Sequence, residues 1–197
     1  MRRAFLRISF VTAAVCILAG YGFAQTCNSS TADDAPASRY QANADGTASD
    51  LRTGLMWTRC ALGQNWNAGS KSCNGKATLY DWEDALQAVQ TLDQGSGYAG
   101  HADWRMPNLR ELMSLSRYHC SDPAINSTIF PNTDSAAFWS SSPIEGRSGE
   151  VWAINFDAGQ AFDDIMANQQ ELRLVRAGAF DNEIPPPASS APAAVIH

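Results

Sequence analysis

The middle of the chain changes from an extended pattern of apolar residues to a helical one. Trp104 and Met106 alternate with polar residues, as in a strand, and Pro107 disfavours helical backbone at the residue before it. Asn108 is a suitable N-cap, with Glu111 three residues later as its capping-box partner. Apolar residues then recur at helical spacing at Leu109, Leu112 and Met113. This stretch predicts a short strand, a sharp stop and a helix.

A longer amphipathic helix is predicted before this stretch. Thr78 and Asp81 resemble a capping box with Asp in place of Glu. The apolar positions that follow recur at steps of three and four, as on one face of a helix. They are Leu79, Trp82, Leu86, Val89 and Leu92. A glycine-rich segment, residues 94–100, is expected to end this helix.

The second half of the chain changes to a period of two, which is typical of strands. Four segments alternate in this way: 137–142, 151–156, 161–165 and 171–176. Because short turns separate most of them, they predict an antiparallel meander. Together with the two helices, they predict an α+β domain.

Two long loops are predicted within this domain, the first of them on the surface. Residues 61–77 are rich in glycine and asparagine, and residues 121–137 are irregular and contain two prolines. Long loops of this kind are uncommon in compact domains and often carry function.

Both ends of the chain are predicted to lie outside the domain, which we place at residues 39–180. Residues 1–24 combine three arginines with an apolar run shorter than the roughly 20 residues of a membrane-spanning helix, as in a cleavable signal peptide. Residues 25–38 are expected to form an N-terminal arm held only by Cys27. Residues 181–197 are rich in proline and alanine and are predicted to be disordered. A secreted or periplasmic bacterial protein is expected, with no stable membrane insertion after cleavage.

Loss of the signal peptide makes the protein more acidic. Residues 1–24 hold three of the 14 basic residues and none of the 20 acidic ones, so the net charge changes from −6 to −9. A protein this acidic has no general attraction for nucleic acid or anionic lipid. No nucleic-acid partner is expected, and sulfated polysaccharides are poor general partners.

Four of the five cysteines remain after cleavage, and an even number in an exported protein indicates disulfides. Four cysteines allow three connectivities. We favour Cys60–Cys73, which closes the first loop, and Cys27–Cys120, which ties the arm to the end of the second helix. A four-cysteine zinc site is disfavoured because the chain contains no Cys-x-x-Cys.

The sequence gives little support for a catalytic or metal-binding site. The chain has no Gly-x-Ser-x-Gly, phosphate loop or His-Glu-x-x-His, and its only histidines are His101, His119 and His197. His101 and His119 flank the central stretch, where a paired metal site competes with the favoured interpretation of scattered surface histidines. We therefore expect no enzymatic activity, no cofactor and no metal.

The apolar side chains divide into a predicted core and one exception. The predicted structural core comprises Trp57, Trp82, Trp104, Leu109, Leu112, Trp139 and Trp152. Trp66 lies instead on the first loop, where it either packs that loop onto the domain or anchors a partner such as a sugar ring. With Asn126, Asn132 and Asp134 of the second loop, it forms the candidate ligand-binding set.

Several motifs occur in a specific order. They are Thr53-Gly54-Leu55-Met56-Trp57, Cys60 with Gly63-Gln64 and Cys73, Asp103-Trp104-Arg105-Met106-Pro107-Asn108-Leu109-Arg110-Glu111-Leu112, Phe138-Trp139-Ser140-Ser141-Ser142, and Val175-Arg176. This combination resembles the Lcl C-terminal domain family, named after a collagen-like bacterial adhesin. The resemblance implies a C-type-lectin-like fold: two helices packed on a curled antiparallel sheet, terminal strands side by side, and long loops. The chain contains no Gly-x-y repeat, so the architecture of that adhesin is not expected.

The chain departs in two places from motifs of proteins with similar folds, and these departures narrow the range of expected functions. Sugar-binding C-type lectins place a Glu-Pro-Asn-like triplet in the long loop and a Trp-Asn-Asp triplet on a later strand. Here Phe130-Pro131-Asn132 lacks the acid, and Trp152-Ala153-Ile154 lacks both Asn and Asp, so a calcium-dependent sugar site is not expected. The resemblance also implies a similarity in fold to formylglycine-generating enzymes, which use cysteines late in the chain, whereas here no cysteine follows Cys120.

Three functions remain open at this point. The leading one is an exported, non-enzymatic binding module for surface adhesion, which recognises a glycan or a surface protein through its long loops. The second is an exported enzyme related to the formylglycine generators. The third is a structural accessory of a cell-envelope assembly.

Overall fold

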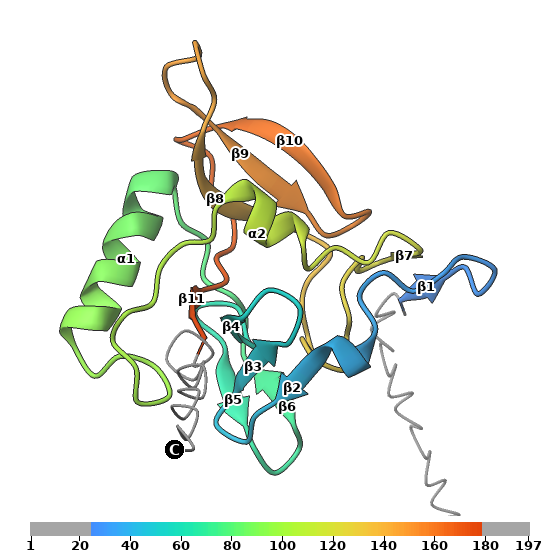
Figure 1. The fold of residues 1–197 in the computed structure, drawn as a ribbon. Coiled ribbons are helices and arrows are strands. Elements are labelled where there is room, and N and C mark those ends of the chain that lie inside the picture. Colours follow the sequence, from blue (N-terminus) through green and yellow to red (C-terminus); the bar gives the residue numbers. More distant parts are fainter. Residues whose placement is uncertain (1–24, 179–197) are drawn as a thin grey trace, which may run out of the picture.

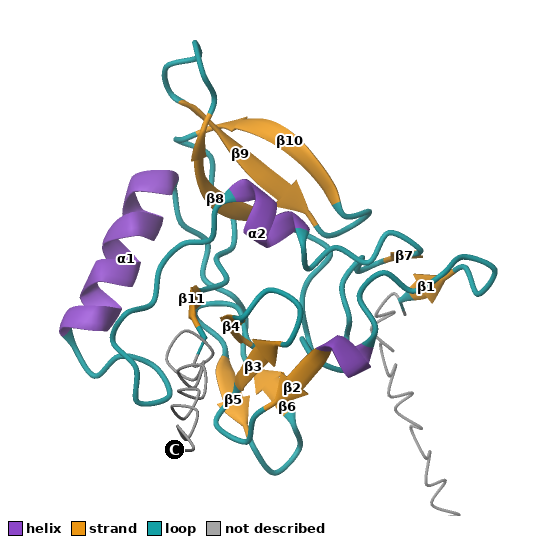
Figure 2. Cartoon of the chain, in the orientation of Figure 1, coloured by secondary structure: helices purple, strands orange, loops and turns teal. Residues whose placement is uncertain are grey.

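The computed structural model describes residues 25–178, which form two helices and several small antiparallel sheets (Figures 1 and 2). The predicted signal peptide, residues 1–24, and the predicted tail, residues 181–197, lie outside the described residues. Within residues 25–178, no helix has the length and hydrophobicity needed to cross a bilayer. The elements agree with an α+β fold stabilised by disulfides.

A four-stranded antiparallel sheet joins the beginning and the end of the domain. Its strands, in the order β11-β4-β3-β2, are Val175–Ala177, Leu55–Thr58, Thr47–Asp50 and Tyr40–Ala42. The expectation that the terminal strands lie side by side is wrong, because β3 and β4 separate β2 from β11. The last strand instead pairs with β4, where Val175 lies opposite Trp57.

A separate three-stranded meander forms the second sheet, drawn in orange at the top of Figure 1. It consists of β8 (Ala137–Pro143), β9 (Glu150–Asn155) and β10 (Gln160–Ile165). The predicted fourth strand does not join it as a strand. Glu171 makes only an isolated parallel bridge to Phe138 before the chain crosses to the four-stranded sheet. The expected single curled sheet is therefore two sheets.

Two short antiparallel strand pairs contain three of the four disulfide-bonded cysteines, and Cys60 lies before β5. β1 (Thr26–Cys27) pairs with β7 (Cys120–Ser121), and β5 (Asn65–Asn67) pairs with β6 (Ser72–Asn74). Cys27 is bonded to Cys120 and Cys60 to Cys73, which confirms both predicted connections.

Helix α1 (Trp82–Gln94) begins later than its predicted start. Asp81 is the N-cap, and its side chain accepts a hydrogen bond from the backbone N–H of Asp84 at 2.8 Å. Tyr80 exchanges two backbone hydrogen bonds with Gln170, at 3.0 and 2.9 Å, which holds the preceding residues extended. Leu79 therefore precedes the helix and is exposed, so its place on the predicted apolar stripe is wrong.

The buried face of α1 also differs from the predicted stripe. Ala85 and Val89 are buried, whereas Leu86 is 38% exposed. Ala85 precedes Val89 by four residues, so the two lie above one another on the same helix face. Ala85 and Val89 belong to the same apolar cluster as Trp104 and Trp139.

Helix α2 (Leu109–Met113) is short and has the predicted start. Asn108 Oδ1 accepts from the Glu111 backbone N–H at 2.9 Å, and Glu111 Oε2 accepts from the Asn108 backbone N–H at 2.8 Å. This reciprocal capping satisfies two donors that a helix start leaves unpaired. The extended stretch before it makes one isolated bridge, Arg105 to Val175, rather than a full strand.

The core consists of two apolar clusters. Trp57, Leu112, Phe130 and Phe138 belong to one, which includes residues of the four-stranded sheet, the three-stranded sheet and α2. The other contains Trp104 and Trp139, together with Ala85, Val89 and Leu172. Among the predicted core residues, Trp57, Trp104, Leu112 and Trp139 are buried, whereas the remaining three are only partly buried: Trp82, Leu109 and Trp152.

The N-terminal arm has more attachments than its disulfide. Ala35 is fully buried in the first core cluster, and Gln25 Nε2 donates to the backbone oxygens of Pro123 and Ile125, both at 2.6 Å. The short 3₁₀ helix η1 (Ala37–Arg39) follows, and Arg39 forms a buried ion pair with Asp50 of β3. The prediction that only Cys27 holds the arm is therefore wrong.

Candidate functional site

The two predicted long loops lie against each other. Gln64 Nε2 donates to the backbone oxygen of Asn132 at 3.0 Å. The backbone N–H of Cys73 donates to Asn132 Oδ1 at 3.1 Å. Asn132 adopts a φ of 54°, a left-handed conformation that asparagine tolerates better than most residues. One side chain thus fixes the disulfide-closed loop against the second loop.

Arg59, which follows β4, joins the same two loops. Its Nε donates to the Ile129 backbone oxygen at 2.7 Å and its Nη2 to the Thr128 oxygen at 3.1 Å. Its guanidinium lies 4.2 Å from the centroid of the Trp66 ring, within the range of a cation–π contact. Burial lowers the pKa of Arg59. Nη1 has no hydrogen-bond partner within residues 25–178 and so remains available as a donor.

A pocket of about 400 Å³ opens where these side chains meet. Four segments supply its walls: the end of β2 with the turn after it, Arg59 after β4, the β5–β6 hairpin and the second loop. The lining residues are Ala42, Asn43, Ala44, Arg59, Trp66, Ala68, Lys71, Thr128 and Ile129. We call this cavity the Trp66 pocket.

The orientation of Trp66 is set by its neighbours. Its Nε1 donates to the Ala44 backbone oxygen at 2.8 Å. Gly46, with a φ of 90°, lies against the indole, and a Cβ at this position would be 2.7 Å from Trp66 Cγ and 2.4 Å from Tyr98 Oη. Only glycine fits this close approach. The tryptophan is therefore held in place without a ligand.

The Trp66 pocket combines an aromatic wall with two cations. Arg59 contributes Nη1, and the exposed side chain of Lys71 lies at the hairpin turn between β5 and β6. Asn43 adds an amide whose Nδ2 donates to Thr47 Oγ1 at 2.8 Å. An apolar surface with a few convergent polar groups is typical of small-molecule sites.

The other predicted ligand residues lie outside this lining. Asn126 is 2% exposed; its Nδ2 donates to the Ala35 backbone oxygen at 2.9 Å, and its Oδ1 accepts from the Thr128 backbone N–H at 3.1 Å. Its amide is therefore a structural connection to the arm and is not available to a ligand. Asn132 joins the loops as described above, and Asp134 is exposed beside Glu171.

Asp134 belongs to a second polar cluster. Its carboxyl group is hydrogen-bonded to that of Glu171, which is 4% exposed. Burial raises the pKa of Glu171 to about 7, and the charge of Asp134 acts in the same direction, whereas nearby Arg173 acts against it. Burial lowers the pKa of Arg173 to about 10. Arg173 Nη1 donates to the backbone oxygens of Thr58 and Arg59, at 2.8 and 2.6 Å, and so holds the backbone that carries the Arg59 side chain.

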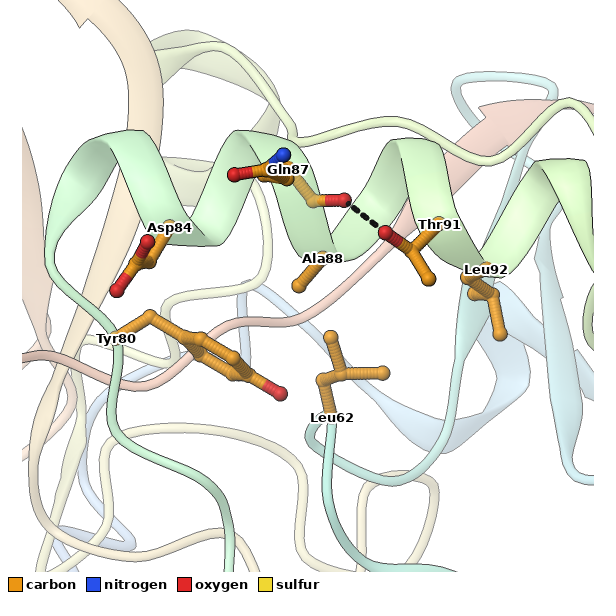
Figure 3. A pocket seen from close by; sticks show the side chains of 7 residues that line it. All are labelled: Leu62, Tyr80, Asp84, Gln87, Ala88, Thr91 and Leu92. Carbon is orange, nitrogen blue, oxygen red and sulfur yellow. Dashed lines mark hydrogen bonds between the residues drawn. The ribbon is translucent and has the colours of Figure 1, made fainter.

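A second cavity, of about 490 Å³, lies beside α1 (Figure 3). Leu62 and Tyr80 face the helix residues Ala88 and Leu92, and Thr91 Oγ1 donates to the Gln87 backbone oxygen at 2.8 Å. Its lining contains no basic residue. We therefore regard the Trp66 pocket as the better candidate site.

Most other basic side chains near the surface are paired with acids. Arg105 binds both carboxylate oxygens of Glu111, at 2.7 and 2.6 Å, and Arg176 binds Asp103. Arg117 pairs with Asp33, and Arg147 pairs with Glu150 and Asp163, at 3.0 and 2.6 Å. These pairs cancel local positive charge, so they do not form an extended basic surface.

Comparison with known families identifies the domain. The Lcl C-terminal domain family matches residues 46–176, about two thirds of the chain. The chain belongs to the Lcl C-terminal domain family. No curated protein matches it.

The matched Lcl C-terminal domain contains most of the Trp66 pocket, including Arg59, Trp66 and Lys71, and excludes the N-terminal arm. Sequence reasoning missed Arg59 and Lys71 as pocket residues. No periodic pattern marks Arg59, because its aromatic partner is brought over it by the loop that the Cys60–Cys73 disulfide closes.

Proposed function

We propose that this protein is an exported, non-enzymatic binding module that recognises a carbohydrate through the Trp66 pocket. Its Lcl C-terminal domain would provide a C-type-lectin-like scaffold on which two long loops are held together. The observation that supports this proposal most directly is that Trp66, Arg59 and Lys71 line one cavity, to which both loops contribute. The signal-peptide pattern and the two disulfides support export.

The chemistry of the pocket favours a sugar that carries a carboxylate. The apolar face of a sugar ring packs on an aromatic surface such as Trp66, and sugar hydroxyls accept hydrogen bonds from donors such as Arg59 Nη1. Two cations in the lining add attraction for an acid, whereas a neutral sugar gains only the packing and neutral hydrogen bonds. Adhesion to a surface that displays such sugars follows from this binding.

Binding is favoured over catalysis by the state of the cysteines. Cys27, Cys60, Cys73 and Cys120 are all in disulfides, so none of them offers a thiol of the kind that the formylglycine generators require. The carboxyl group with a strongly raised pKa, Glu171, does not line the Trp66 pocket.

The proposal is tested on an array of neutral, carboxylated and sulfated glycans, followed by titration of the best binder with the mature protein. Lys71→Gln is expected to weaken binding of carboxylated glycans. Lys76→Gln is the matched control, because Lys76 is also exposed but does not line the pocket. Trp66→Phe keeps a ring but removes the indole donor and part of the surface, and it is expected to weaken all glycan binding.

Two results would contradict the proposal. One is the absence of any hit on the array, and the other is a hit whose affinity is the same in the wild type, Lys71→Gln and Trp66→Phe. Thermal melting of each variant shows whether the fold is retained.

A further inference from the structure

The N-terminal arm brings two carboxylates beside a histidine that is distant in sequence. Asp33 and Asp34 lie in the arm, and His119 directly precedes Cys120. The Cys27–Cys120 disulfide and the pairing of β1 with β7 join the two segments. The Asn28 backbone N–H also donates to the His119 backbone oxygen at 2.7 Å. The relative position of these three side chains is therefore fixed by the fold.

The His119 side chain is only 6% exposed, and its Nδ1 is buried without a hydrogen-bond partner among the described residues. This nitrogen lies 3.5 Å from Asp34 Oδ1 and 3.9 Å from Asp33 Oδ1. Buried polar atoms are normally paired, and leaving one unpaired is costly. An unpaired imidazole nitrogen beside two carboxylate oxygens offers the atom types of a metal-ligand set.

We propose that His119, Asp34 and Asp33 form a binding site for a divalent transition metal, with Zn²⁺ as the preferred ion. Their ligand atoms all lie within 4.8 Å of one another. Two ligands bound tetrahedrally to zinc at about 2.1 Å lie about 3.4 Å apart. The His119–Asp34 separation already matches this value, and Asp33 needs a movement of about half an ångström.

The donor set selects the class of metal. An imidazole nitrogen with carboxylate oxygens suits Zn²⁺ and related ions, whereas Ca²⁺ and Mg²⁺ prefer oxygen ligands alone. The sulfurs of Cys27 and Cys120 also lie near His119, but the disulfide leaves neither as a thiolate. Water completes the coordination, since Asp33 and Asp34 are partly open to solvent.

Arg117 orients one ligand and limits the affinity. It pairs with Asp33 through both carboxylate oxygens, while Asp33 Oδ1 also accepts from the Ala35 backbone N–H at 3.1 Å. These bonds hold the carboxylate in position, and the neighbouring positive charge repels the metal. We therefore assign His119 and Asp34 as the principal ligands and Asp33 as the weaker one.

Metal binding would clamp the arm to the body of the domain. Asp34 moves with the arm, whereas His119 belongs to the segment leading into β7. A ligand that binds only the folded state raises the melting temperature. Zinc is therefore expected to stabilise the protein through a contact that is separate from the Trp66 pocket.

The test is calorimetric titration of the untagged mature chain with ZnCl₂, in a His197→Ala background that removes the histidine of the tail. One equivalent of Zn²⁺ is expected to bind and to raise the melting temperature. His119→Asn and Asp34→Asn should each weaken binding by more than about tenfold. His101→Ala is the matched control, because His101 packs against Trp104 instead.

The alternative is that His119, when protonated, only makes ion pairs with the two carboxylates. Absence of saturable Zn²⁺ binding by the wild type would support this alternative. A Zn²⁺ affinity that is unchanged in Asp34→Asn would also contradict the proposed site. If His119→Asn fails to fold, Asp34→Asn gives the answer alone, because Asp34 is exposed. NMR shifts of the His119 ring on addition of zinc, absent in Asp34→Asn, would locate the metal.

Discussion

The buried carboxyl group of Glu171 makes the stability of the protein depend on pH near neutrality. Glu171 is 4% exposed, and its Oε2 has no hydrogen-bond partner in the described part of the chain. Burial raises its pKa from 4.5 to about 7, helped by the charge of Asp134. Arg173 favours the ionised form, but its effect is smaller than that of burial. The folded protein therefore binds the Glu171 proton more tightly than the unfolded chain does.

The sign and size of the effect follow from this difference. Because the pKa is higher in the folded state, protonation of Glu171 stabilises the fold, and this stability is lost as the pH rises from 4.5 through 7. Each pKa unit corresponds to about 1.4 kcal/mol, so the loss approaches about 3 kcal/mol. A domain of this size has about 5–15 kcal/mol to lose, which makes the change large enough to measure.

The assay is urea unfolding at several pH values from 5 to 8. Glu171→Gln resembles the protonated acid in shape and can donate a hydrogen bond to Asp134. Its free energy of unfolding is expected to change little over this range and to exceed that of the wild type at pH 8. Glu145→Gln, in the exposed turn between β8 and β9, is the control and should follow the wild type.

Four other carboxylates have pKa values shifted in the opposite direction to that of Glu171. Their pKa values are lowered, chiefly by hydrogen bonds to arginine, so their contribution is lost only when the pH falls below the usual carboxyl range. This group includes Asp33, Asp50, Asp103 and Glu111. If wild-type stability were constant between pH 5 and 8, and Glu171→Gln had no effect at pH 8, the argument from burial would be wrong.

Three further predictions concern the core, the disulfides and the charge. Trp104→Ala should cost about 3–5 kcal/mol in urea unfolding, and the partly buried Trp152→Ala clearly less; equal losses would contradict the burial argument. Mass spectrometry of the unreduced, denatured mature protein should find no alkylated thiol, and peptide mapping should link Cys60 to Cys73; two free thiols would refute the two-bridge structure. On a heparin column the protein should elute below physiological salt, since its surface arginines are largely paired; tight, salt-sensitive retention would contradict this.

Local signals in the sequence predicted the elements that depend on neighbouring residues. The capping box of Asn108 and Glu111 is present as expected, because both partners lie within one helical turn. Strands β8, β9 and β10 form where the segments 137–142, 151–156 and 161–165 predicted them. The Cys60–Cys73 disulfide was predicted from the composition of the loop that it closes, and the Cys27–Cys120 disulfide from the position of the N-terminal arm.

Contacts between distant residues overrode local preference at several places. The predicted start of α1 moved because Tyr80 pairs with Gln170, which is 90 residues away. The strand expected at residues 171–176 is divided, because Glu171 pairs with β8 while Val175 pairs with β4. Neither partner can be recognised from periodicity alone.

At the candidate sites, too, the sequence singled out some residues, and only the structure showed which other residues lie beside them. The sequence identified Trp66 as the loop aromatic, but the structure supplied Arg59 over its ring and assigned Asn126 to an internal hydrogen bond. The sequence considered His119 together with His101, whereas the structure places it beside Asp33 and Asp34.

The order of motifs in the sequence therefore determined the family, and residue types at short spacing determined the capping box of α2 and the positions of β8, β9 and β10. The sequence also favoured both disulfide pairs, although Cys27–Cys120 joins residues 93 positions apart. Tertiary structure alone decided which side chains converge at the Trp66 pocket and around His119. It also decided that Glu171 is buried beside Asp134. Convergence and burial depend on how separate elements pack, and burial is what shifts a pKa and leaves a nitrogen unpaired.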